Sequence, residues 1–172
     1  MSTMFELSPA TPQEGASSGT KVDLKKRLSH LYNPPAKEVV VVEVPAMQFL
    51  MIDGAGNPNT AQEYKEAIEA LYGVAYALKF LLKKEQGLDY SVMPLEGLWW
   101  TPDMREFSAE HKEHWLWTMM IMQPEEVTAA HFEQARAREM QRKKDSPALA
   151  KLRLERFYEG LAVQIMHVGP YA

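Results

Sequence analysis

One stretch of the chain, residues 89–101, places a carboxylate and large aromatic side chains on a single extended segment. It reads Asp-Tyr-Ser-Val-Met-Pro-Leu-Glu-Gly-Leu-Trp-Trp-Thr. Alternate side chains of a strand share a face, so Glu96 and Trp100 would lie on one face and Trp99 on the other. The proline confines such a strand to a sheet edge or a bulge, and the glycine after Glu96 lets a ligand approach the backbone. The pattern predicts a pocket floor around Glu96, although core tryptophans with Glu96 in water fit it equally well.

Two kinds of chemistry suit a carboxylate beside aromatic rings. In a binding site, the rings would stack on a flat, apolar or cationic molecule, and Glu96 would supply a buried counter-charge. In a hydrolase, the same rings would orient a strained electrophile while Glu96, or a tyrosine such as Tyr171, positions water or protonates the leaving carbonyl. Burial would raise the pKa of such a carboxyl group toward values useful for proton transfer. These residues specify a pocket and not a reaction, so we predict binding and leave enzymatic activity open.

Composition narrows the classes of protein further. With 172 residues, 46% of them hydrophobic, the chain suits one globular domain, and a net charge of −4 without blocks of one sign argues against nucleic acid or a membrane surface as a partner. The chain has no cysteine, no apolar run of the roughly 20 residues that span a bilayer and no signal-peptide core, so we expect a cytoplasmic protein. The 11 methionines and 4 tryptophans are typical of a permissive apolar site or of a core of large residues. His111 and His114 have the spacing of some metal ligands, but no third ligand supports them. We therefore expect a small-molecule ligand, no metal and no cofactor.

Hydrophobic periodicity predicts the elements that position this stretch. Alternating or β-branched runs predict strands, and apolar residues at helical spacing predict helices. The expected strands are residues 39–44, 47–52, 90–100, 114–122 and 161–168, and the expected helices are residues 60–87, which start at a Thr-x-x-Glu capping box and end at a glycine, and 124–144. Residues 149–157 fit either a strand or a short helix, and residues 21–31 fit a helical turn or a docking arm. Residues 1–20 lack periodicity and are expected to form a disordered tail.

Two further patterns bear on the pocket. Tyr72, Tyr76 and Phe80 form an aromatic ridge on the long predicted helix, which would line the pocket only if it faced the strand of Glu96. A strand followed by a glycine-containing turn occurs twice, and the first occurrence continues into a helix and two strands whereas the second reaches the end of the sequence. This predicts a duplicated unit whose second copy is truncated.

Four ordered motifs carry a resemblance to a known family. They are residues 37–59, which end in Asp-Gly-Ala-Gly-Asn-Pro-Asn, residues 92–100 (Val-Met-Pro-Leu-Glu-Gly-Leu-Trp-Trp), residues 120–124 (Met-Ile-Met-Gln-Pro) and residues 160–171 (Gly-Leu-Ala-Val-Gln-Ile-Met-His-Val-Gly-Pro-Tyr). Together they resemble the GyrI-like small-molecule-binding proteins. The resemblance covers a domain of residues 21–172, with a first unit at about 38–124 and the start of a second at about 125–172.

The resemblance implies an α+β fold in which duplicated β-α-β-β units with antiparallel sheets flank a ligand cleft about a pseudo-twofold. The family includes effector domains of multidrug-sensing transcription regulators, a gyrase inhibitory protein and a branch of cyclopropanoid cyclopropyl hydrolases, which open the cyclopropane ring of DNA-alkylating natural products. A stand-alone member close to that branch would bind xenobiotic or drug-like molecules in an aromatic and methionine-lined cleft, or hydrolyse such rings for protection. Such a member would bind neither nucleic acid directly nor a membrane. Inhibition of a partner enzyme and formation of a homodimer both stay open.

The family motifs also mark site residues. The Pro-Leu-Glu-Gly motif carries over to residues 94–97 with the aromatic residues behind it, and the His-x-Gly-Pro-Tyr motif carries over to residues 167–171. The expected catalytic residues are Glu96 and Tyr171. The expected ligand-binding residues, including those from the helix and strand patterns, are Met93, Glu96, Trp99, Trp100, Tyr72, Tyr76, Trp117, His167 and Tyr171.

Overall fold

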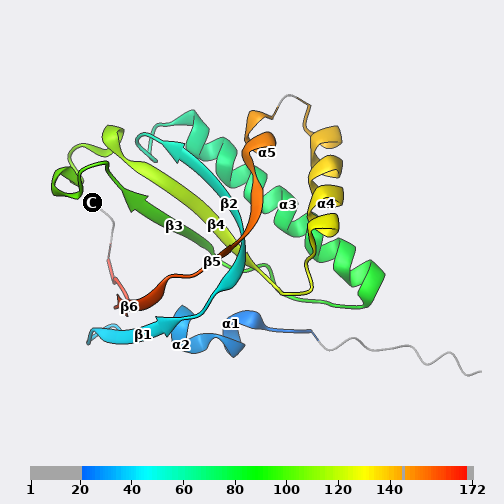
Figure 1. Ribbon diagram of the computed structural model, residues 1–172, viewed down its shortest axis with the longest axis horizontal. Helices are drawn as coiled ribbons and strands as arrows, with labels where there is room; N and C mark the ends of the chain where they lie inside the picture. Colours follow the sequence, from blue (N-terminus) through cyan, green and yellow to red (C-terminus); the bar gives the residue numbers. More distant parts are fainter. Residues whose placement is uncertain (1–20, 145, 170–172) are drawn as a thin grey trace, which may run out of the picture.

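The computed structural model describes residues 21–144 and 146–169, and these form a mixed α+β structure (Figure 1). The helices are α1 (Leu24–Arg27), α2 (Ser29–Tyr32), α3 (Gln62–Gln86), α4 (Ala129–Arg142) and α5 (Pro147–Lys151). The strands are β1 (Val40–Val44), β2 (Met47–Ala55), β3 (Leu95–Trp100), β4 (Leu116–Gln123), β5 (Arg153–Phe157) and β6 (Gly160–Gln164). Two short 3-10 helices, Met104–Glu106 and Lys112–His114, connect β3 to β4. The predicted tail, residues 1–20, lies outside the described residues, and so does Tyr171.

Four strands form one antiparallel sheet in the order β3-β4-β2-β5. Its register sets Met51 of β2 opposite Met120 of β4, and Met120 opposite Glu96 of β3. Residues that lie opposite each other in neighbouring strands point to the same face, so these three side chains form a row across the sheet. The predicted α+β class with antiparallel strands is confirmed, and the succession β2-α3-β3-β4 is a β-α-β-β unit within residues 38–124.

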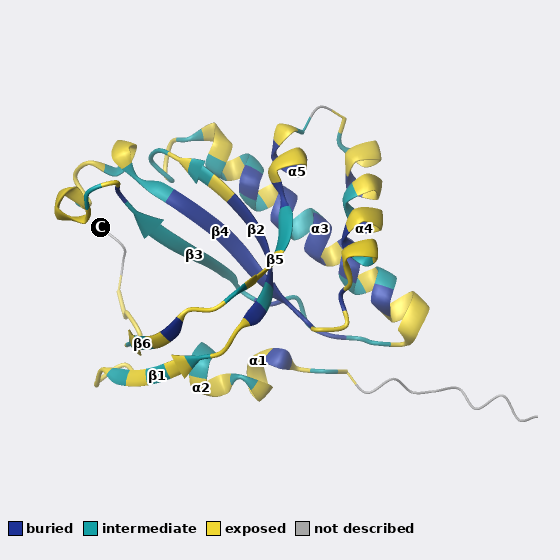
Figure 2. Cartoon of the chain, viewed as in Figure 1, coloured by how far each residue is buried: buried dark blue, intermediate teal, exposed yellow. Residues whose placement is uncertain are grey.

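The other face of the sheet is covered by α3, with α4 and α5 beside that helix (Figure 1). Trp117 of β4 is 0% exposed, and its ring meets Tyr64 of α3 edge-on with 5.3 Å between the centroids. The ring lies across β2 at Gly54, where a Cβ atom would come within 2.1 Å of it. Figure 2 shows that buried residues are concentrated in β4, β2 and the inner side of α3. The core therefore lies between the sheet and the helices.

The long helix begins later than its capping box predicts. Its N-cap is Ala61, whose side chain makes no capping hydrogen bond, so the prediction of a cap at Thr60 was wrong. Thr60 is still part of a turn, because the backbone N–H groups of Thr60 and Ala61 both donate to the carbonyl of Asn57, at 3.1 and 2.8 Å. The predicted end is confirmed, since Gly87 caps the helix at a φ of +68° that favours glycine.

Other boundaries differ from the periodicity. The strand expected from residue 90 begins at Leu95, because the preceding segment runs along the amino-terminal residues, where the N–H of Val22 donates to the carbonyl of Asp89 at 2.7 Å. The helix expected from residue 124 begins after Thr128, whose Oγ1 accepts from the N–H of His131 at 3.2 Å. The strand expected at 161–168 ends at Gln164, and residues 149–157 hold the end of α5 followed by β5, so each alternative describes one half.

A separate two-stranded antiparallel sheet is formed by β1 and β6, with Val41 opposite Val163. Together with α1 and α2 it lies against part of the face of the large sheet that α3 leaves uncovered (Figure 1). The side-chain Nε2 of Gln164 in β6 donates to the carbonyl of Leu31 in α2 at 3.1 Å, which joins the two parts. We call α1, α2, β1 and β6 the cap.

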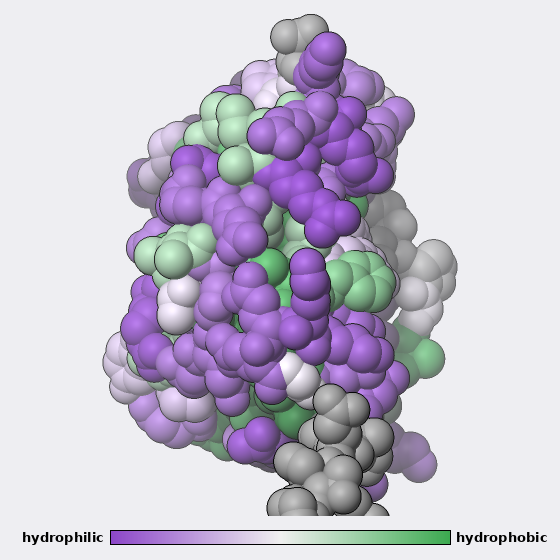
Figure 3. Space-filling model, turned by 90° about the vertical axis from the view of Figure 1, so that its right-hand side faces the viewer, coloured by the Kyte–Doolittle hydropathy of each residue, from purple (hydrophilic) through white to green (hydrophobic). Residues whose placement is uncertain are grey.

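The outer surface on the helix side is mainly polar. Figure 3 views the molecule from the side of α4 and shows a largely hydrophilic face with smaller apolar areas. Within the described ranges, no helix combines the length and the apolar composition needed to cross a bilayer.

Candidate functional site

A cavity of about 400 Å³ lies between the cap and the uncovered face of the large sheet. Its apolar wall comes from β1, β2, β4 and β5, through Val44, Met47, Phe49, Met120 and Phe157. Its polar groups come from the cap, from β3 and from the turn between β5 and β6, through Lys25, Tyr32, Glu96, Glu159 and Gln164. A concave apolar wall with a few polar groups is the usual form of a small-molecule site.

Glu96 is placed on the cavity side of β3 by its register opposite Met120. The hydroxyl of Tyr32 in α2 donates a hydrogen bond to Glu96 Oε1 at 2.7 Å. Burial raises the pKa of Glu96, the hydrogen bond from Tyr32 lowers it and the charge of Glu159 raises it, with a resulting pKa of about 7. Near neutral pH the carboxyl group is therefore present in both forms, and it can act as a counter-charge, an acid or a base.

The hydroxyl of Tyr32 remains protonated at neutral pH. Its pKa is raised first by burial, then by the charge of Glu96 and by the hydrogen bond to that residue. The hydroxyl donates to one carboxyl oxygen of Glu96, Oε1, and this contact fixes the orientation of the carboxyl group. The second carboxyl oxygen takes no part in the contact.

The amide of Gln164 adds an acceptor to the cavity lining. Its Nε2 is engaged by the carbonyl of Leu31, whereas its Oε1 is buried and accepts no hydrogen bond from the described residues. A buried acceptor of this kind is costly unless a ligand or a water molecule satisfies it. Among the polar groups of the lining, the carboxyl group of Glu96 is therefore the one with a free acceptor oxygen beside a buried donor contact.

Trp100 shares the face of Glu96, as the alternation predicts, but stands at the other end of β3. It lies opposite Leu116 and lines a separate surface depression together with Asp53 and Arg153. Arg153 bridges to Asp53 there, with 3.0 Å between Nη1 and Oδ2. The structure therefore does not bring Trp100 into the cavity of Glu96.

Three further expected ligand-binding residues are packed into the core. Trp117 and Met93 are 0% and 2% exposed. Trp99 lies on the helix face, where its ring centroid is 5.8 Å from that of Tyr64 and 5.5 Å from that of Trp115. Because side chains alternate along β3, Trp99 cannot share the face of Glu96. The large rings fill the layer between sheet and helices and do not reach the cavity.

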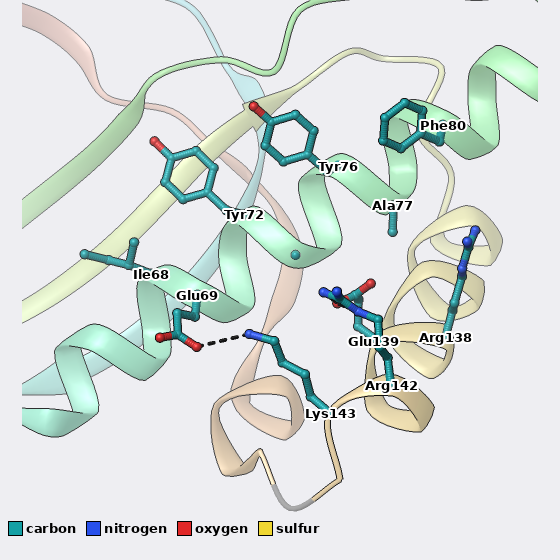
Figure 4. Close-up of a pocket in the computed structure, with 11 residues that line it drawn as sticks. Ile68, Glu69, Tyr72, Tyr76, Ala77, Phe80, Arg138, Glu139, Arg142 and Lys143 are labelled. Atoms are coloured by element: carbon teal, nitrogen blue, oxygen red, sulfur yellow. Dashed lines mark hydrogen bonds and ion pairs between the residues drawn. The ribbon is translucent and has the colours of Figure 1, made fainter.

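Tyr72 and Tyr76 lie on α3, away from Glu96. Figure 4 shows their rings on α3 at a groove between α3 and α4. The groove has a volume of about 510 Å³, and the two ring centroids are 6.4 Å apart. On the α4 side, Glu139 pairs with Arg142 at 2.6 Å. The aromatic ridge does not face the strand of Glu96, which was the condition for its lining the pocket.

The carboxyl-terminal motif contributes little to the described site. His167 is exposed and follows the end of β6, and it is not part of the cavity lining. Tyr171, the second expected catalytic residue, lies outside the described residues. Its role stays a prediction.

Sequence reasoning missed Tyr32, which lies 64 positions before its partner Glu96. The only signal was the segment just before it, residues 21–31, expected to be a helical turn or a docking arm. The structure shows both, since α1 and α2 are single turns and Leu24 of α1 is buried against the core. Pairing at this distance in the sequence leaves no periodic trace.

No metal centre is evident in the described part of the chain. There, no group of three or more His, Asp or Glu side chains is placed to hold a metal ion. His111 and His114 are both exposed and lie beside Glu113 on the surface.

Comparison with known proteins finds no matching family model and no matching curated protein. Solved structures do match, and three of them come from Listeria innocua. One, described as an uncharacterized conserved protein, is 37% identical over 87% of this chain and 73% of its own, with a TM-score of 0.79. Two are described as hydrolases. The first is 36% identical over 87% of this chain and 75% of its own, with a TM-score of 0.73. The second is 37% identical over 88% of this chain and 74% of its own, with a TM-score of 0.78. The chain therefore belongs to the same family as these Listeria innocua proteins.

Proposed function

We propose that the cavity around Glu96 binds small, flat, apolar or cationic molecules of the xenobiotic or drug-like kind, and that the family is the GyrI-like one. The observation that carries this is a buried carboxyl group in a wall of Met, Phe and Val side chains. Such a wall holds a flat molecule by burying its apolar area, and the carboxylate attracts positive charge. Methionine side chains adapt to different shapes, so discrimination among ligands would be loose.

The hydrogen-bonding groups favour a ligand that donates. The Tyr32 hydroxyl donates to Glu96 and the Gln164 amide nitrogen donates to the carbonyl of Leu31, so these two donors of the lining are already engaged. A protonated amine or amidine can donate to the carboxylate of Glu96. A planar cation with N–H groups therefore pairs with Glu96 better than a neutral ring does, and Glu159 balances the charge of Lys25 in the lining.

Calorimetric titration with planar cationic dyes tests this function. Heat is a better readout than tryptophan fluorescence, because none of the four tryptophans lines the cavity. Since a cation binds the ionised form of Glu96, its affinity should rise as the pH rises through about 7, with roughly a tenfold change per pH unit below that value. Glu96→Gln should lose about 1–3 kcal/mol of binding and this pH dependence.

Two controls sharpen the titration. A neutral dye of the same shape should bind with little dependence on pH in either protein. Glu43→Gln removes an exposed carboxylate of β1 whose contact is the hydroxyl of Tyr158, and it should bind the cation like the wild type. Equal affinity and an equal pH profile in Glu96→Gln and in the wild type would contradict the role of Glu96.

A second function is favoured by a separate observation, namely that two of the homologous structures are described as hydrolases. We propose as the alternative that the protein hydrolyses the strained cyclopropane ring of DNA-alkylating natural products. Glu96 would take a proton from water as the water oxygen bonds to a ring carbon. The ring C–C bond would break toward a conjugated carbonyl of the substrate, whose oxygen would then receive the proton from Glu96. A carboxyl group with a pKa of about 7 suits both transfers.

Mass spectrometry of a cyclopropane-bearing alkylator after incubation separates the two functions. Hydrolysis gives a product heavier by one water, and Glu96→Gln should abolish it. Tyr32→Phe should slow it, because the carboxyl group loses the donor that orients it. Binding of the alkylator without a change in its mass would reject the hydrolase and retain the binding function.

A further inference from the structure

The polar side chains of the cavity lining differ in whether their donor groups already have an acceptor. Three of them carry donors, namely Lys25, Tyr32 and Gln164. The hydroxyl of Tyr32 donates to Glu96 Oε1 at 2.7 Å. The Nε2 of Gln164 donates to the carbonyl of Leu31 at 3.1 Å. The ammonium group of Lys25 is therefore the donor of the lining that has no acceptor among the described residues.

Lys25 is held at the opening of the cavity by the short helix α1. The helix is capped by Asp23, whose Oδ1 accepts from the N–H of Lys26 at 3.0 Å. Leu24, next to Lys25 in the chain, is only 8% exposed and packs into the core. Lys25 itself lines the cavity and is exposed, so its methylene groups can follow the apolar wall while the ammonium group stays in water. The ammonium group can thus meet a ligand without the cost of burying a lone charge.

The acidic groups of the lining leave Lys25 without a close counter-ion. No residue in the described part of the chain forms an ion pair with its ammonium group. Glu159, the other exposed charged residue of the lining, lies in the turn between β5 and β6, and its charge raises the pKa of Glu96. When Glu96 is ionised, the lining carries two negative charges and one positive charge. The cavity therefore attracts a cation and also offers one positive group to an acceptor.

We propose that Lys25 is a specificity-determining residue of the cavity and that the preferred ligand is a planar molecule with two polar ends. One end is a cation with N–H groups that pairs with Glu96, and the other is a carboxylate or carbonyl oxygen that accepts from Lys25. This inference rests on the proposed function, because it assumes that a cation binds at Glu96. A purely cationic molecule is the poorer ligand, because the ammonium group repels it and gains no acceptor from it. In the alternative function, the conjugated carbonyl oxygen of the alkylating substrate is such an acceptor.

Calorimetric titration with benzamidine and with para-amidinobenzoate tests the role of Lys25, because these two planar cations differ only by a carboxylate at the far end of the ring. The corresponding naphthalene pair gives a longer spacing between the two charged groups. We expect the carboxylate to raise the affinity of the wild type roughly threefold to tenfold in at least one pair, as for an ion pair that is partly exposed. Lys25→Met keeps an unbranched side chain and removes the ammonium group. This variant should lose the gain and should bind benzamidine at least as tightly as the wild type does.

Lys26 provides the matched control. It lies on the same turn of α1 and is exposed, but it is not part of the cavity lining. Lys26→Met should therefore retain the gain from the carboxylate. Lys25→Arg keeps a charged donor and should retain the gain as well. Both lysines are exposed, so thermal denaturation should give the same midpoint for all three variants and the wild type.

The outcomes separate the role of Lys25 from the function of the cavity. A carboxylate gain that is equal in Lys25→Met and in the wild type would overturn the assignment of Lys25 and leave the cation site intact. The same conclusion would follow if the wild type bound both amidines of each pair equally well and Glu96→Gln weakened them. If no amidine bound the wild type at all, the proposed function would fail, and this inference would fail with it.

Discussion

The carboxyl group of Glu96 and the hydroxyl of Tyr32 meet in a partly buried contact of 2.7 Å, and each changes the proton affinity of the other. A hydrogen bond from a neutral donor favours the ionised carboxylate, so Tyr32 holds the pKa of Glu96 below the value that burial alone would give. The pair therefore sets the fraction of Glu96 carboxyl groups that is ionised at neutral pH.

Tyr32→Phe removes this donor and little volume. We expect the pKa of Glu96 to rise above about 7 and the free energy of unfolding to fall by about 1–2 kcal/mol. Carbon-detected NMR of the glutamate carboxyl groups measures the first effect, and chemical denaturation measures the second. The control is Tyr158→Phe, whose hydroxyl contacts Glu43 at 2.6 Å on the surface and whose loss should matter less. An unchanged Glu96 titration in Tyr32→Phe would show that the contact does not form in solution.

The buried carboxyl of Glu96 also makes the stability of the fold depend on pH. Its pKa is about 7 in the folded state and 4.5 ordinarily, so the folded chain holds this proton more tightly than the unfolded chain. The stability that Glu96 contributes is therefore fully present below about pH 4.5 and is lost as the pH rises through about 7, by up to about 3 kcal/mol.

Glu96→Gln tests this linkage, because glutamine has a similar shape and does not titrate. Chemical denaturation of both proteins at pH 5 and at pH 8 should show the variant gaining stability relative to the wild type at the higher pH. The difference between the proteins removes the contribution of every other titrating group. A stability difference that is the same at both pH values would place Glu96 in solvent.

The packing of β2 against α3 depends on the absence of a side chain at Gly54, where the ring of Trp117 lies. A methyl group at this position would overlap the ring, whose own position is fixed by Tyr64 at 5.3 Å. We expect Gly54→Ala to lower the free energy of unfolding by about 1–3 kcal/mol. Adding Trp117→Phe, which shortens the ring, should recover part of this loss in a double-mutant cycle followed by thermal denaturation. Two additive losses would mean that the two residues do not touch.

The sheet and its long helix could be predicted from local patterns. Residues 47–52 and 114–122 are largely apolar runs typical of strands buried on both faces, and the helical spacing before Gly87 reflects one buried face of α3. The same alternation correctly separated Glu96 from Trp99. The alternation could not show which face of the sheet the helices cover. That choice decides whether a tryptophan is packed in the core or lines the cavity. Trp117 and Trp99 were expected at the ligand for this reason, and they pack under α3 instead.

The residues that begin helices and the segments that dock on the sheet were less predictable, for a different physical reason. Thr60 has the residue pattern of an N-cap, but a turn closed by the Asn57 carbonyl shifts the start of α3 past it. Tyr32 reaches Glu96 only because α1 and α2 dock on the sheet, and such docking depends on contacts between distant segments rather than on local propensity. The elements of the cap were therefore expected from the sequence, but the contact of Tyr32 with Glu96 was not.

Residues 21–144 and 146–169 form a large sheet with its helices and a cap that, within these residues, shares no strand pairing with that sheet. β4 lies between two strands and is buried along almost its whole length, whereas alternate residues of β1 are exposed and β1 has one neighbour. Cooperative units with few buried contacts open locally at a lower free energy than the core. The cap and the sheet should therefore open as two units.

Native-state hydrogen exchange measures this division directly. We expect amides in β1 and β6 to exchange roughly 100-fold or more faster than those in β4, because the cap can lift while the sheet stays folded. A cation bound at Glu96 should slow exchange in the cap, since Tyr32 and Gln164 line the cavity together with Glu96. Equal protection of β1 and β4 without ligand would mean that cap and sheet unfold together, and the cavity between them would then be a fixed part of the fold.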